Sequence, residues 1–511
     1  MHPKFYLAAA LAGSWQAAAS SILFTGGTIV AFDRKSGGLN VIRNGSVLVE
    51  NDVIKTVSAG GIPVPKGNAV ETVDITGKII TPGFVNTHMH LWQTAFKTLA
   101  SNTSLVEYFS RYGEFAAASL LSVDDVYIGQ LAGILESLNG GVTTILDHSH
   151  HTWSNATSLA GLQASIDSGG RIFWSYAFHN ITRNGTNYQI PEQLANFRDL
   201  ATKAPFKGSP TTLGVAYDSF SGNPNTAEIR NVIDTAKKYN ASVITTHALG
   251  GPWGISNMPE DLAGLGILNI SIPIVFSHAS FLNDTGAALL RESNHYVSTT
   301  PESEYHYGHT HPRIHLYQDQ ISLGVDTHFT FSADILTQAR LWLQPVRRLL
   351  YAEVLSRNEV PSHNPMSANQ AFLLATRHGG LALRREDIGV IEEGAKADLV
   401  VWDGTSPSLL GWNDPVAAVI LHASIADVEH VLVDGKWMKK GFKLTQKTYP
   451  EIKKRFLASA SRIQRDLINL KSEFPQPGDT WQFSGLKVAD PTQVDTLRGP
   501  GTGYGVPFLK A

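Results

Sequence analysis

The residues Ile79-Ile-Thr-Pro-Gly-Phe-Val-Asn-Thr-His-Met-His90 combine a short apolar run with two closely spaced histidines. The apolar run predicts a buried strand over Ile79–His88. Side chains two positions apart on a strand point to the same face, so His88 and His90 would lie together at the strand end as a metal-binding pair. The alternative is a polar loop in which two of the 19 histidines fall close together by chance.

Composition describes an ordinary globular protein and restricts the chemistry of any site. The 511 residues are 43% hydrophobic and 17% charged, with a formal net charge of −3. This balance gives no reason to expect nucleic acid or an anionic membrane as a partner. The chain has no cysteine, so thiolate ligands and cysteine nucleophiles are excluded. A metal must therefore be held by histidine and carboxylate side chains.

The first twenty residues differ from the rest of the chain. A weakly basic start leads into the Ala-rich apolar run Phe5–Ala19, which predicts a secretory signal peptide over residues 1–20. Asn-x-Ser/Thr sequons support a secreted or secretory-pathway location, and they begin at Asn44, Asn102, Asn155, Asn180, Asn184, Asn240, Asn269 and Asn283. Asn269 is expected to stay unmodified, because it lies where a short connection meets a buried strand.

Residues 78–382 alternate between apolar strands and amphipathic helical segments. The predicted strands are Ile79–His88, Val142–Asp147, Arg171–Phe178, Thr212–Tyr217, Ser242–His247, Pro273–His278, His295–Thr299 and Ile321–Asp326. Strict alternation implies a parallel sheet, and eight repeats imply closure into an α/β (β/α)8 TIM barrel. The alternative is a doubly wound open sheet, but no Gly-rich dinucleotide loop follows the first strand.

The segments on either side of the barrel consist of short strands and tight turns. Because chain termini tend to lie close together, residues 21–77 and 383–444 are predicted to form one composite β-sandwich. In the last segment, residues 445–511, a helix is expected over Tyr449–Lys471. The Gly- and Pro-rich remainder is expected to be an extended tail on the surface.

Metal-capable side chains gather at the predicted strand ends. Active sites on this barrel form at the C-terminal ends of the strands, from residues of several strands. The candidates are His88 and His90 after strand one, Asp147, His148, His150 and His151 after strand two, His247 after strand five, His278 after strand six, and Asp326 with His328 after strand eight. Scattered surface histidines would not select one end of so many strands.

Four motifs together resemble the amidohydrolase superfamily over nearly the whole mature chain. The motifs are Pro82-Gly-Phe-Val-Asn-Thr-His-Met-His90, Gly140-Gly-Val-Thr-Thr-Ile-Leu-Asp147, Leu323-Gly-Val-Asp326, and Ala375-Thr-Arg-His-Gly-Gly380 followed by Glu393-Gly-Ala-Lys-Ala-Asp-Leu-Val-Val401. The subgroup that is most similar holds cytosine, guanine and adenosine-type deaminases and the triazine hydrolases. Dimers are common in this family, so the resemblance allows a homodimer.

The resemblance implies a role for each matched residue. His88, His90, His247 and Asp326 would hold one divalent metal ion, either Zn²⁺ or Fe²⁺, because strand four ends without the lysine of binuclear members. His278 would polarise the substrate. Asp326 would also transfer protons during hydrolysis of a C–N bond, either deamination or amide opening, in a small nitrogenous heterocycle.

One position departs from the subgroup. Relatives usually carry a proton-shuttling glutamate three residues after the strand-five histidine, and here that position is Gly250. Glu302 and Glu304 are candidate replacements, and His150 or His151 could also serve. A binding protein that has lost catalysis is the alternative, although such a protein has no need of an open metal site.

Aromatic side chains and histidines near the motifs are expected to shape the substrate pocket. Trp92 follows the paired histidines, Trp253 follows His247, and His306 follows the two glutamates. Together with His150 these residues are the predicted substrate contacts, because aromatic walls suit a flat heterocycle. The alternative for Trp92 is helix packing.

Overall fold

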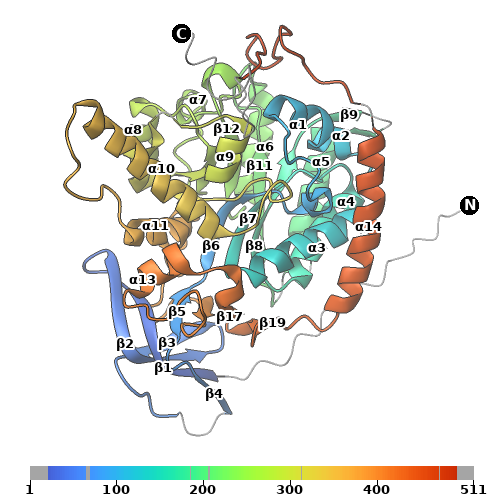
Figure 1. The fold of residues 1–511 in the computed structure, drawn as a ribbon. Helices are drawn as coiled ribbons and strands as arrows, with labels where there is room; N and C mark the ends of the chain where they lie inside the picture. Colours follow the sequence, from blue (N-terminus) through green and yellow to red (C-terminus); the bar gives the residue numbers. More distant parts are fainter. Residues whose placement is uncertain are drawn as a thin grey trace, which may run out of the picture.

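The fold is seen in a computed structural model that describes residues 21–64, 69–183, 186–204, 206, 208–311, 313–470 and 472–491. The predicted signal peptide, residues 1–20, lies outside the described residues, as does the sequon at Asn184. Figure 1 shows a barrel with helices around it, a separate sheet beside it, and the C-terminal helix along one flank.

The central sheet confirms the predicted (β/α)8 barrel. Its eight parallel strands run in the order β15-β14-β13-β12-β11-β8-β7-β6. A parallel bridge between Met89 and Asp326 brings the first and last strand ends together. The strands are β6 (Phe84–Met89), β7 (Val142–Ser149), β8 (Arg171–Phe178), β11 (Thr212–Tyr217), β12 (Ile244–Ala248), β13 (Ile274–His278), β14 (Tyr296–Thr299) and β15 (Ile321–Leu323).

The predicted first strand is two strands that belong to different sheets. β5 (Ile79–Pro82) pairs with β1 (Ser21–Asp33) and β16 (Leu399–Trp402) outside the barrel, whereas β6 pairs with β7 inside it. The chain passes between the sheets at Gly83, where a Cβ atom would lie 2.1 Å from the Thr143 hydroxyl oxygen. The absence of a side chain at Gly83 therefore allows the close approach that separates the two strands.

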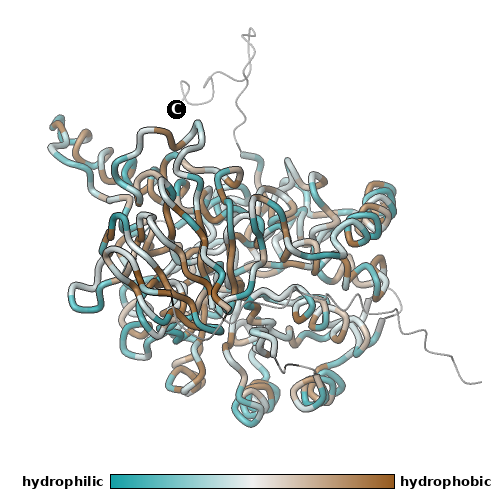
Figure 2. The backbone as a smooth tube through the Cα atoms, turned by 90° about the horizontal axis from the view of Figure 1, so that it is seen from below, coloured by the Kyte–Doolittle hydropathy of each residue, from teal (hydrophilic) through white to brown (hydrophobic). Residues whose placement is uncertain are grey.

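Helices cover the outer face of the barrel. In α6 (Thr226–Lys238) the buried Ile229, Val232, Ile233 and Ala236 recur at helical spacing, and Asn225 caps the N-terminus. Among the described residues, the other α-helices of four or more residues are α1 (Leu105–Arg111), α2 (Glu114–Ala117), α3 (Val123–Asn139), α4 (Asn155–Asp167), α5 (Ile190–Lys203), α7 (Pro259–Gly264), α8 (Asp284–Ser293), α9 (Pro301–Tyr307), α10 (Ile335–Ser356), α11 (Ala368–Ala375), α12 (Arg377–Ala382) and α14 (Tyr449–Asn469). In Figure 2, many of the residues in the interior are hydrophobic, and many of the turns at the periphery consist of hydrophilic residues.

The two segments that flank the barrel come together in one nine-stranded sheet. Its order is β19-β18-β17-β16-β5-β1-β2-β3, with β4 paired to β1. Phe24 from the first segment and Trp437 from the second belong to one buried cluster, which gives this sheet a core of its own. The strands are β1 (Ser21–Asp33), β2 (Gly38–Glu50), β3 (Val53–Ser58), β4 (Val70–Asp74), β16 (Leu399–Trp402), β17 (Val428–Val433), β18 (Lys436–Lys440) and β19 (Lys443–Leu444).

The predicted C-terminal helix is α14, which packs against α3. The described residues after it, 472–491, do more than lie on the surface. Trp481 is buried and its indole N–H donates to the Trp253 carbonyl at 2.9 Å. In the described part of the chain, no helix is both long and apolar enough to cross a membrane.

Candidate active site

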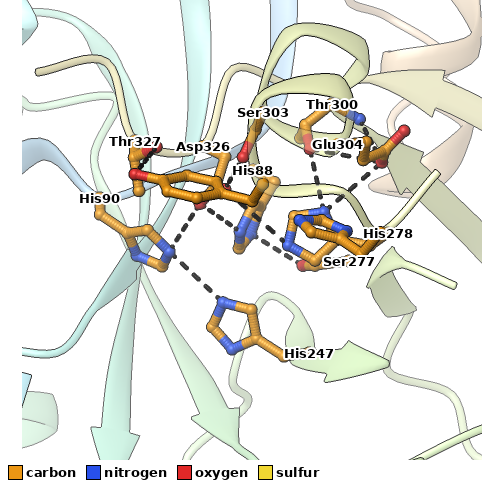
Figure 3. Close-up of polar contacts among 12 residues, drawn as sticks. His88, His90, His247, Ser277, His278, Thr300, Ser303, Glu304, Asp326 and Thr327 are labelled. Carbon is orange, nitrogen blue, oxygen red and sulfur yellow. Dashed lines mark hydrogen bonds and ion pairs between the residues drawn. The ribbon is translucent and has the colours of Figure 1, made fainter. Parts of the chain in front are cut away.

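Two histidines and an aspartate meet where the barrel closes. The Asp326 Oδ1 atom lies 3.3 Å from His88 Nε2 and 3.0 Å from His90 Nε2. All three side chains are buried. The main chain fixes this arrangement, because the amide of Asp326 donates to the His88 carbonyl at 2.9 Å. Figure 3 shows the side chains facing one another at the strand ends.

His247 joins the cluster from β12 on the opposite wall. Its Nε2 atom lies 3.3 Å from His90 Nε2, and a dashed line in Figure 3 marks this contact. Its Nδ1 atom lies 2.8 Å from Asp218 Oδ2, and its backbone N–H donates to the same carboxylate. Burial alone would lower the pKa of His247, but the adjacent Asp218 carboxylate raises it.

The three imidazoles are oriented in the same way. In each ring the Nδ1 atom has a partner: Ser277 Oγ at 2.7 Å for His88, the His148 carbonyl at 3.0 Å for His90, and Asp218 for His247. Partners of this kind fix the ring orientation of metal-binding histidines. The Nε2 atoms are thereby directed toward a common point.

The donor set fits a divalent cation. The buried His88 Nε2 atom makes no hydrogen bond with any described residue. Ligand bonds of about 2.1 Å at tetrahedral angles place donor atoms roughly 3.4 Å apart, close to the 3.3 Å between His90 Nε2 and His247 Nε2. The predicted ligands His88, His90, His247 and Asp326 therefore converge, as a site for one divalent cation requires.

His278 also belongs to this cluster. Its donor atom lies within 4.8 Å of donor atoms of His88, His247 and Asp326. Its Nδ1 atom lies 2.9 Å from the Thr300 hydroxyl, and its Nε2 atom lies 4.0 Å from Asp326 Oδ2. His278 and Asp326 have φ values of 71° and 69°. Non-glycine residues pay a steric cost in this region, and such strain is typical of functional sites.

The two glutamates that sequence reasoning proposed for proton transfer lie behind the cluster. Glu304 is buried, lies 2.6 Å from His311 Nε2 and lies 3.5 Å from His278 Nδ1. Burial alone would raise the pKa of Glu304, but the neighbouring histidines lower it. Glu302 accepts a hydrogen bond from Gln338 at 3.0 Å, and burial raises its pKa to about 7. The structure brings neither carboxylate into the described lining of the pocket.

The end of strand four carries Asp218, a residue for which sequence reasoning noted only that it is not lysine. Asp218 Oδ2 lies 2.8 Å from His247 Nδ1 and 3.4 Å from His148 Nε2. Burial alone would raise the pKa of Asp218, but these two imidazoles lower it. Its position at a strand end was the available signal, and the structure makes it the residue that orients His247.

The cluster lies in a cavity of about 390 Å³, within the ~300–1,000 Å³ range of small-molecule sites. Phe483 from the C-terminal tail lines this cavity and contacts Phe109, so the tail forms part of the wall. The lining includes Leu105, Tyr108, Phe109, Glu114, Phe115, His148, His150, Phe178, Asp218, Leu249, Tyr307, His309 and Phe483. Phe483 could not be predicted as a pocket residue, because nothing in a Gly- and Pro-rich tail indicates where the tail packs.

Of the predicted substrate contacts, His150 lines the cavity, where its ring stacks on His90 with centroids 4.1 Å apart. Trp92 is fully buried and packs against Trp153, as its alternative interpretation expected. Trp253 lies behind the pocket wall, where it contacts Trp481. His306 contacts Phe331, and His151 contacts Trp174. Within the described residues, these four side chains are outside the pocket lining.

Fold and site together define a metal-dependent hydrolase built on a (β/α)8 barrel. The sequence model of the Amidohydrolase family matches residues 79–438. The chain therefore belongs to that family and is an enzyme that hydrolyses carbon–nitrogen bonds other than peptide bonds.

Two curated relatives cover most of the chain. The chain is 27% identical over 417 residues to a 5-methylthioadenosine/S-adenosylhomocysteine deaminase from Dictyoglomus turgidum. The matched region covers 78% of this chain and 89% of the relative. The chain is also 27% identical over 428 residues to a 5'-deoxyadenosine deaminase from Methanothermobacter thermautotrophicus. Here the matched region covers 81% of this chain and 92% of the relative.

Two solved structures share the fold. An adenosine deaminase from Xanthomonas campestris with bound zinc has a TM-score of 0.72 at 19% identity and covers 88% of this chain and 99% of its own. An atrazine chlorohydrolase from Arthrobacter aurescens TC1, solved with zinc, has a TM-score of 0.72 at 18% identity and covers 86% of this chain and 100% of its own.

Proposed function

We propose that the enzyme is a zinc-dependent deaminase of an aminopurine nucleoside or a related heterocycle. The observation that carries the proposal is the convergence of His88, His90, His247 and Asp326 at the base of an aromatic-walled cavity. Three imidazoles and one carboxylate are a donor set that suits zinc, with Fe²⁺ as the alternative ion. The names of the two curated relatives supply the substrate class.

A bound divalent cation would polarise the substrate and lower the pKa of a water molecule from ~15.7 to about 7. The chain's own residues would do the rest. Asp326 takes a proton from the attacking water and delivers it to the departing nitrogen. His278 is fixed through Nδ1 by Thr300, so its other ring nitrogen is held toward Asp326 and the reacting carbon.

A metal analysis combined with a substrate panel tests this function. Purified protein is expected to carry about one equivalent of zinc or iron, and His247→Ala is expected to lose it because one donor of the set is removed. Metal-loaded protein is expected to release ammonia from 5'-deoxyadenosine, 5-methylthioadenosine or another aminopurine. The panel also contains pyrimidines, triazines and cyclic amides. Stoichiometric metal without turnover of any compound would contradict the proposal, as would full metal retention by the variant.

We also propose that the protein enters a secretory pathway. The basis is the apolar run over residues 5–19 together with the sequons, and all seven sequon asparagines among the described residues are exposed. Asn269 is one of them, so its exposure leaves it available for modification, contrary to the expectation from its position next to a buried strand.

Expression in a eukaryotic secretory host should yield glycosylated protein that starts near residue 20 or 21. Treatment with an N-glycosidase should then lower its mass by several glycans, as intact-mass spectrometry can measure. Protein that is retained in the cytosol, with an intact leader and no change of mass, would contradict this location.

A further inference from the structure

Three carboxylates line the described part of the cavity: Asp326, Asp218 and Glu114. Asp326 is held by His88 and His90, and Asp218 by His148 and His247. The hydrogen bond that acts on the Glu114 carboxylate comes from its own backbone, and no side chain of another described residue pairs with it. It is also only partly buried, so it faces the space that a substrate would fill.

Glu114 is placed by a short helix above the strand ends. It opens α2, in the connection between β6 and α3, and the next residue, Phe115, contacts the ring of His179. The charged groups that act on Glu114 are His247, Asp218 and His90, which lie around the cluster. Burial raises the pKa of Glu114 above its usual value, so the protonated acid persists nearer to neutral pH than in an exposed glutamate.

In this fold, a side chain at Gly250, the position of the missing strand-five glutamate, would not point into the pocket. Gly250 has a φ of 74°, and a Cβ atom built there would lie 3.0 Å from Met258 Cε and 3.4 Å from Phe281 Cβ. A side chain at Gly250 would therefore contact Met258 and Phe281 instead of entering the cavity. The acid that meets the substrate must come from another element.

His309 is the strongest competitor for this role, because it also lines the cavity. Its Nδ1 atom lies 3.3 Å from the Ser280 hydroxyl. Burial lowers the pKa of His309 to about 3, so the ring is neutral and a poor proton donor at neutral pH. Glu302 and Glu304 are engaged by Gln338 and His311 behind the cluster.

We infer that Glu114 is the catalytic residue that protonates the substrate ring nitrogen, in place of the strand-five glutamate. This inference rests on the proposed deamination. The water oxygen bonds to the ring carbon as Asp326 takes one water proton, while the C=N electron pair moves to the ring nitrogen and Glu114 gives that nitrogen its proton.

The second half of the reaction restores both acids. The exocyclic nitrogen takes the proton held by Asp326 and leaves as ammonia with the electron pair of the broken C–N bond. The new hydroxyl group gives its proton to the Glu114 carboxylate as the carbonyl forms. One water is consumed, and both side chains return to their starting states.

The test compares Glu114→Gln with the wild-type holoenzyme on the panel compound that the wild type turns over fastest. Glutamine keeps the shape and hydrogen bonding of the side chain but supplies no acid. We expect kcat to fall about 100-fold or more, with KM within about threefold, because general acid catalysis contributes roughly 10²–10⁴-fold. We also expect the pH profile of kcat/KM to lose the limb on which wild-type activity falls as Glu114 ionises with rising pH.

The matched control is Glu107→Gln on α1, which makes the same change in a glutamate that pairs with Arg111. It should keep wild-type kcat, and thermal unfolding should show that all variants are folded. Glu114→Asp, which keeps an acid on a shorter side chain, should recover part of the lost kcat. An active wild type whose Glu114→Gln variant keeps kcat within threefold, or changes KM alone, overturns the inference. A metal-loaded wild type that turns over nothing overturns the proposed deamination instead.

Discussion

Asp326→Asn is expected to lower kcat by at least about 1,000-fold while the fold is retained. The aspartate Oδ1 atom lies 3.0 Å from His90 Nε2 and 3.3 Å from His88 Nε2, so it would hold the cation together with these histidines and, in the proposed reaction, accept the proton of the attacking water. Asparagine has nearly the same shape but neither the charge nor the basicity. The expected loss combines the ~10²–10⁴-fold effect of general acid–base catalysis with weaker metal binding.

Steady-state kinetics on metal-saturated protein, with metal content measured alongside, separate these two contributions. The control is Asp334→Asn, which changes a buried aspartate that caps α10 by accepting from the Leu336 amide at 2.8 Å. Asparagine caps helices as well as aspartate does, so this variant should keep nearly full activity. If Asp326→Asn kept more than about a tenth of wild-type kcat, the role assigned to Asp326 would be wrong.

The strand-end histidines could be predicted because two local rules place them. The period of two along a strand puts His88 and His90 on one face, and the barrel gathers strand ends at one rim. The same rules place Asp218 at the rim but do not give its function, which depends on the His247 ring of the neighbouring strand β12. They also miss Phe483, which reaches the pocket from beyond the last helix.

The errors have physical causes that a linear pattern does not contain. Ile79–Met89 is buried throughout, and nothing in its pattern of apolar and polar residues marks the change of sheet at Gly83, where the chain packs closely against Thr143. Glu302 and Glu304 follow a strand end, but α9 begins there, and it directs both side chains toward Gln338 and His311 instead of the cavity. Glu114 could not be selected from the sequence, because its place in the cavity lining is a property of the fold alone.

Arg171→Met is expected to destabilise the fold by about 3–5 kcal/mol. Arg171 starts β8 at the end of the barrel away from the site, and its guanidinium is buried. It donates to Asp398 at 2.7 and 3.0 Å and also pairs with Asp434. Asp398 directly precedes β16 and Asp434 lies in the turn between β17 and β18, so this ion pair joins the terminal sheet to the barrel. Methionine fills similar space but leaves two carboxylates without their cation.

The exposed counterpart is Arg34, which pairs with Glu386 and Glu392 at 2.6 Å and also links the two halves of the sequence. Arg34→Met should cost less than about 1 kcal/mol, because water already solvates these charges. Urea unfolding followed by tryptophan fluorescence measures both changes. Adding Asp398→Asn and Asp434→Asn to Arg171→Met should recover part of the loss, since the penalty comes from uncompensated buried charge. An equal loss of unfolding free energy in the Arg171 and Arg34 variants would show that burial does not determine how much the Arg171 ion pair stabilises the fold.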